Sequence, residues 1–151
     1  MQGATFPDRI HVEVLSRQKP LPGMLVLTRI VMREQNDYFG IFGPTDELGF
    51  LTITQGELLQ AATATRQFYR DEFADPLTAF AGLIEVRVLD EAGIERALEA
   101  HAALKDYPYV EGHLARLKSA RRVLQQMGRV LMEVSVTAEG GTSEVKAEVP
   151  L

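Results

Sequence analysis

The sequence contains no cysteine among its 151 residues. Disulfide bonds, thiolate metal sites and thiol chemistry are therefore excluded together. A chain without cysteine fits a reducing compartment, so we expect a cytoplasmic protein, with export by another route left open.

Targeting and membrane-spanning patterns are also missing. Residues 1–9 contain no basic region followed by an apolar core, which is the pattern of a signal peptide. No apolar run approaches the roughly 20 residues that a membrane-spanning helix needs. We therefore expect a soluble protein with no membrane span.

Known catalytic and ligand-binding motifs are absent as well. No serine lies in a GxSxG pattern, no glycine-rich loop matches GxGxxG or a P-loop, and no histidine has HxxxH or HxxE spacing. We therefore assign no catalytic residue, expect neither a metal nor a cofactor, and favour a non-enzymatic function.

The charge of the chain limits its possible partners, and its length limits the number of domains. The formal net charge is −5, and phosphate neutralisation by basic residues supplies most non-specific affinity for nucleic acids. We therefore do not expect a nucleic-acid partner. The hydrophobic fraction of 46% is that of a globular chain, and the length predicts a single domain over residues 1–151.

Alternating or continuous apolar residues predict five strands in a β-rich part that covers residues 10–89. Residues 10–15 and 83–89 alternate clearly, and the apolar run after Gly23 has the composition of a central strand. Turn-forming residues separate the first four strands. The expected strands are 10–15, 24–32, 38–42, 50–53 and 83–89.

Three helices are predicted after the first four strands. Thr54 and Glu57 form a capping-box pattern that begins a helix over about 55–74, inserted in the β-rich part. Asp90 is a suitable N-cap for a helix pair over 90–127, whose short connection indicates antiparallel packing. Alternation on both sides of Gly140 and Gly141 predicts a closing β-hairpin over 129–150.

The first third of the chain resembles the prealbumin-like β-sandwich family, which includes transthyretin-like and carboxypeptidase regulatory-like domains. The residues that carry the resemblance are Lys19-Pro20-Leu21-Pro22-Gly23-Met24-Leu25-Val26 and Thr45-Asp46-Glu47-Leu48-Gly49-Phe50-Leu51-Thr52-Ile53. They are similar to the family's entry to its second strand and to its T-D-x-x-G turn. The hydrolases of the family end in Tyr-Arg-Gly-Ser, whereas this sequence ends in Val149-Pro150-Leu151, so the resemblance implies a non-catalytic binding or structural module.

The last predicted helix concentrates basic charge on an acidic chain. Its basic residues and the two nearby tyrosines have the composition of protein-interface hot spots, which favours recognition of an acidic protein partner. The alternatives are a solvated outer face whose cations pair with Glu95, Glu99 or Glu111, and contact with nucleic acid. The candidate partner-binding residues are Arg116, Lys118, Arg121, Arg122, Tyr107 and Tyr109.

The histidines supply the remaining candidate site. His101 lies on an apolar helical stripe, and His113 lies on the following helix, so the two rings could approach each other. We interpret His101 as a half-buried packing residue and His113 and His11 as surface residues. The alternative is that His101 lines a ligand pocket between sheet and helices, in a small-molecule carrier or hydrolase.

The sequence as a whole predicts an α+β fold. It consists of an antiparallel prealbumin-like β-sandwich with an inserted helix and a C-terminal helix pair plus β-hairpin. We expect a protein-interaction or assembly module that recognises its partner through the helix pair or a sheet edge. Unpaired sheet edges also allow a homo-oligomer.

Overall fold

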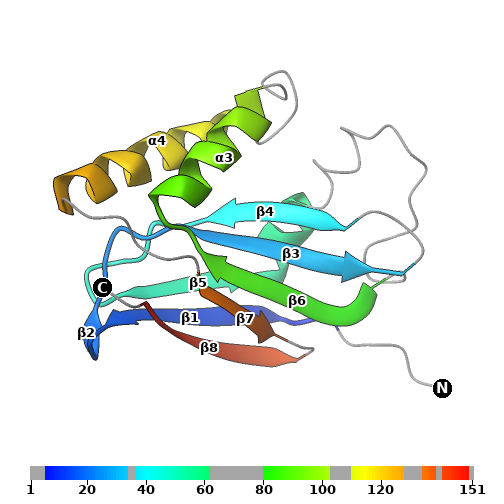
Figure 1. Cartoon of the computed structure of the whole chain (residues 1–151). Coiled ribbons are helices and arrows are strands. Elements are labelled where there is room, and N and C mark those ends of the chain that lie inside the picture. Colours follow the sequence, from blue (N-terminus) through cyan, green and yellow to red (C-terminus); the bar gives the residue numbers. More distant parts are fainter. Residues whose placement is uncertain are drawn as a thin grey trace.

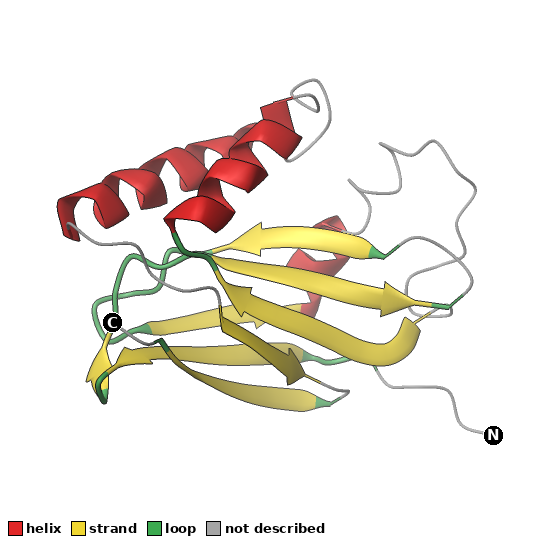
Figure 2. Cartoon of the chain, in the orientation of Figure 1, coloured by secondary structure: helices red, strands yellow, loops and turns green. Residues whose placement is uncertain are grey.

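The computed structural model describes residues 6–33, 37–61, 80–102, 110–127, 134–138 and 141–149. These residues form three layers, in which a helix pair lies on one sheet and that sheet lies on a second sheet (Figure 1). Figure 2 shows the same arrangement by secondary structure. The mixed α+β sandwich expected from the sequence is therefore confirmed as an architecture.

Sheet A is the layer farthest from the helix pair, and β1 lies at its centre (Figure 1). Its strands are β1 (Arg9–Ser16), β2 (Lys19–Pro20), β5 (Phe50–Thr54) and β8 (Thr142–Glu148). β2 and β5 pair with β1 antiparallel, whereas β8 pairs with it parallel. The first and last strands of the chain are therefore neighbours.

Sheet B lies between sheet A and the helices, and all its pairings are antiparallel. Its strands, in spatial order, are β4 (Tyr38–Phe42), β3 (Val26–Met32), β6 (Phe80–Val88) and β7 (Val134–Ala138). β3 has neighbours on both sides, as its nearly continuous apolar sequence predicted.

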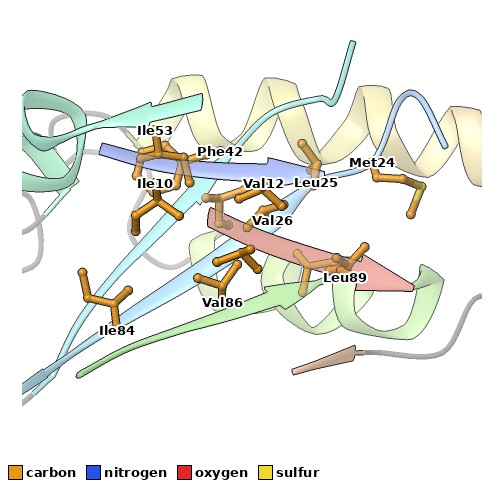
Figure 3. Packing of buried hydrophobic residues seen from close by; sticks show 14 of the residues in the cluster. Ile10, Val12, Met24, Leu25, Val26, Phe42, Ile53, Ile84, Val86 and Leu89 are labelled. Atoms are coloured by element: carbon orange, nitrogen blue, oxygen red, sulfur yellow. The ribbon is translucent and has the colours of Figure 1, made fainter. Parts of the chain in front are cut away.

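The strand pattern decides which side chains enter the space between the sheets. In β1, Ile10, Val12 and Val14 are fully buried, while Arg9 is exposed on the other side. Successive side chains of a strand point to opposite faces, so alternation in the sequence becomes one core face and one outer face. Figure 3 shows side chains from both sheets packed together in this core.

The C-terminal strands do not form the hairpin predicted over 129–150. β7 pairs with β6 in sheet B, and β8 pairs with β1 in sheet A. The two strands therefore extend different sheets instead of pairing with each other. The local turn and the alternation were compatible with both arrangements, and the predicted pairing was wrong.

The helices begin where the sequence predicted. The Thr54 hydroxyl accepts from Glu57 N at 3.2 Å and the Glu57 carboxylate accepts from Thr54 N at 3.2 Å, which begins the helical residues 55–61. Asp90 caps α3 (Glu91–Ala102) through a 2.7 Å bond from Gly93 N to Asp90 Oδ1. The rest of the expected helix 55–74 lies outside the described residues.

The inserted helix covers β4 at a glycine. A Cβ atom at Gly40 would lie 2.7 Å from the Phe42 ring and 2.9 Å from Ala61 Cβ. Only a residue without a side chain lets helix and strand approach so closely. Gly40 lies within β4, as the predicted strand 38–42 implies, and packing requires a glycine there.

The turn at Thr45 to Gly49 joins the two sheets and fixes the start of β5. Asp46 Oδ1 accepts from Leu48 N and from Phe50 N, both at 2.9 Å. Gly49 has a φ of 79°, and a Cβ atom there would lie 2.6 Å from the Val14 carbonyl oxygen. These contacts hold the turn at both ends and fix the backbone of Leu48 and Phe50.

Within the described residues, no helix combines the length and the hydropathy of a membrane span.

Candidate functional site

α4 (Val110–Met127) and α3 run in opposite directions beside each other over sheet B (Figure 1). The buried residues of α4 are His113, Leu117 and Ala120, at helical spacing. Leu114, although apolar, is only half-buried. The predicted helix pair is confirmed, and His113 belongs to the buried face of α4.

Two of the predicted partner-binding cations instead hold α4 on its neighbours. Arg121 Nη1 lies 3.2 Å from Glu95 Oε1 on α3, which is one of the ion pairs considered from the sequence. Arg116 Nη1 donates to the Ile41 carbonyl of β4 at 3.3 Å. These contacts position the helix and leave fewer cations for an external partner.

Lys118 and Arg122 remain exposed one turn apart on α4, and Gln125 is exposed on the turn after them. Neither cation forms an ion pair with another residue of the described part of the chain. We call Lys118, Arg122 and Gln125 the basic stripe. Predicted residues Tyr107 and Tyr109 lie outside the described residues.

His101 and His113 contact each other between the two helices. Their ring centroids are 5.5 Å apart with an interplanar angle of 65°, which is an edge-to-face arrangement. His101 Nδ1 donates to the Ala97 carbonyl at 2.9 Å, and His113 is 7% exposed. The expected approach of the two rings is confirmed, but the surface position expected for His113 is wrong.

Burial disfavours the charged form of both rings. It lowers the pKa of His113 to about 4, and His101 and Arg116 shift this pKa in the same direction. Burial also lowers the pKa of His101, and the hydrogen bond to the Ala97 carbonyl partly opposes this shift. Both rings are therefore neutral at pH 7.

The ring neighbour of His101 is another histidine. Among the residues that the structure describes, no three His, Asp or Glu side chains converge in a way that could hold a metal ion. The contacts of His101 are those of a packing residue near the C-terminal end of α3.

A second surface was not singled out from the sequence. Residues of sheet A line a depression of about 520 Å³. Sheet A is the layer farthest from the helix pair (Figure 1). His11, Glu13, Phe50 and Lys146 are among the residues that line the depression. The sequence signal for this surface was Phe50. Leu51 and Ile53 alternate on the inner face of the strand, so Phe50 lies on the outer face.

Comparisons with known proteins do not assign the chain to a family. No family model matches the chain, and no curated protein matches it. Among solved structures it is similar to a crystal structure of a 9R-lipoxygenase from Cyanothece PCC8801, with a TM-score of 0.35 and 13% identity. The match covers 100% of this chain and 18% of that chain, and a likeness this low carries no argument about fold or function.

Proposed function

We propose that the protein is a non-enzymatic interaction module in which the basic stripe of α4 binds an acidic surface of a partner protein. The proposal rests on one observation, which is that the four cations of α4 differ in their contacts. Arg116 and Arg121 contact β4 and α3, while Lys118 and Arg122 project from the opposite side without a described counter-ion.

The charge distribution supports an acidic partner. The chain has a net charge of −5, yet α4 carries Arg116, Lys118, Arg121 and Arg122 against a single carboxylate at Glu111. A local patch of opposite sign steers a complementary surface toward itself and disfavours other orientations. The resemblance of residues 10–54 to prealbumin-like modules favours the same class of non-catalytic protein.

The rigidity of the stripe supports the same function. The inner face of α4 is buried at Leu117 and Ala120, and the Arg121–Glu95 ion pair ties the helix to α3. A helix fixed in this way loses little conformational freedom when a partner binds. Arg122 can also pair with a carboxylate in the bidentate geometry that makes arginine frequent at interfaces.

The test is affinity capture from a lysate of the source cells, using the full chain and the variant Lys118→Glu/Arg122→Glu. The matched control is Arg17→Glu/Lys19→Glu, which makes the same change of net charge on exposed residues that directly follow β1. We expect one acidic protein to be captured by the wild-type chain and the control, and at least about tenfold less by the α4 variant.

The captured protein must also cross-link to Lys118, and capture must weaken as salt rises. Equal capture by the α4 variant and the control would contradict the proposal. Loss of capture after nuclease treatment would assign the stripe to nucleic acid instead.

A further inference from the structure

The outer face of sheet A is an exposed surface that the proposed function does not use. It is built from outward-pointing residues of three neighbouring strands, in register across the sheet. The helix pair lies on the far side of sheet B, so it does not cover this face (Figure 1). Its residues are Arg9, His11 and Glu13 of β1, Phe50, Thr52 and Thr54 of β5, and Thr142, Glu144, Lys146 and Glu148 of β8.

Two large apolar side chains stand at one end of this face. Phe50 is 45% exposed and lines the depression, and Leu48 is 62% exposed on the adjoining turn. The two hydrogen bonds to Asp46 Oδ1 fix the backbone of both residues. An exposed apolar side chain on a fixed backbone can act as an anchor for a partner, because little backbone entropy is lost when it becomes buried.

Charges of both signs lie on the same face. The cations are Arg9 and Lys146, and the carboxylates are Glu13, Glu144 and Glu148. Lys146 Nζ lies 4.0 Å from Glu13 Oε1 and its side chain is 70% exposed, so it remains available to a second carboxylate. A second copy of the chain can therefore place a carboxylate of its own face opposite Lys146.

We propose that the outer face of sheet A is a self-association surface and that its occupant is a second copy of this chain, related by a twofold axis. A twofold interface uses the same patch on both subunits, so the patch must be complementary to itself. This face supplies a projecting Leu48 and a depression beside Phe50, together with Lys146 and Glu144 of opposite charge. Each Leu48 enters the depression of the other copy, and each Lys146 faces the Glu144 of the other copy.

The first experiment is sedimentation velocity of the full chain over a series of concentrations. We expect a monomer–dimer equilibrium, and Leu48→Asp weakens the dimer by at least about tenfold because it places a charge in the apolar contact. Leu48 is exposed, so the variant keeps its circular dichroism spectrum and melting temperature. Lys118→Glu/Arg122→Glu, on α4, dimerises like the wild-type chain and separates this surface from the basic stripe.

The second experiment tests the pairing of charges. Glu144→Lys and Lys146→Glu each weaken self-association when alone, because each places like charges opposite one another. A mixture of the two variants restores a dimer that contains one copy of each, which native mass spectrometry resolves. A wild-type chain that stays monomeric at its highest soluble concentration, a dimer unaffected by Leu48→Asp, or a mixture that does not form the mixed dimer would overturn the proposal.

Discussion

The imidazole rings of His101 and His113 pack edge to face, 5.5 Å apart between α3 and α4. His113 is buried beside Arg116, which in turn donates to β4. The contact between α3 and α4 therefore contains two neutral histidines. Protonation of either ring would place positive charge in this contact.

Acidification destabilises the protein through His113. The folded pKa of about 4 lies below the unfolded value of 6.5, so the unfolded chain takes up the proton first. The stabilising contribution is complete above about pH 6.5 and is lost as the pH falls toward 4. By pH 5 the loss amounts to about 2 kcal/mol.

Urea unfolding between pH 7.5 and pH 4.5 measures this effect. His113→Leu flattens the pH dependence in this window, because the leucine has no proton to gain. His11→Gln, on sheet A, removes a half-buried histidine outside the helix pair and is the control variant. The same slope in His113→Leu and in the wild-type chain would rule out this origin.

Thr45 connects two loops through its buried hydroxyl. Its Oγ1 donates to the Leu21 carbonyl at 2.8 Å and accepts from Met24 N at 3.0 Å. Thr45→Val keeps the shape but leaves both backbone groups without this partner, so the free energy of unfolding falls by about 2 kcal/mol. Chemical denaturation measures the change, with the exposed Thr52→Val as the control, and similar losses in both variants would contradict the account.

The hairpin turn between β1 and β2 places two ordinary residues in left-handed backbone. Arg17 has a φ of 50° and Gln18 a φ of 65°, in a two-residue connection that favours Asn-Gly. Arg17→Asn/Gln18→Gly therefore stabilises the protein by about 1 kcal/mol, because these residues adopt positive φ with less strain.

Thermal unfolding of Arg17→Ala/Gln18→Ala separates this effect from the loss of the side chains. The alanine variant removes the same side chains but keeps the strain, so its melting temperature does not rise. An equal gain in both variants would show that the backbone conformation is not the cause.

Local sequence patterns were sufficient to predict most of the helices and strands. The alternation of Ile84, Val86 and Val88 identified the buried face of β6, and Asp90 and Thr54 identified two helix starts. These features depend on residues close together in the sequence, which a single chain displays directly.

Pairing between distant segments could not be predicted in the same way. The tail has alternation on both sides of Gly141 that suits a hairpin, and only the free edges of β1 and β6 decide that its strands join different sheets. The same limit applied to Gly40, whose role depends on Ala61 in the inserted helix.

The basic helix was located correctly, but the burial of His113 was not predicted. The inner face contains Leu117, Ala120 and His113, whereas Leu114 is only half-buried. The same packing directs Arg116 toward β4, so the cations that remain exposed could be identified only from the packed structure.

The parallel pairing of β1 with β8 has a consequence for synthesis on the ribosome. Arg9 emerges long before its neighbour Thr142, because the two residues are far apart in the sequence. Until β8 emerges, one edge of β1 has no strand beside it and can pair with another nascent chain. Sheet A is therefore completed only after β8 has been synthesised, and the long sequence separation between its paired strands slows this last step.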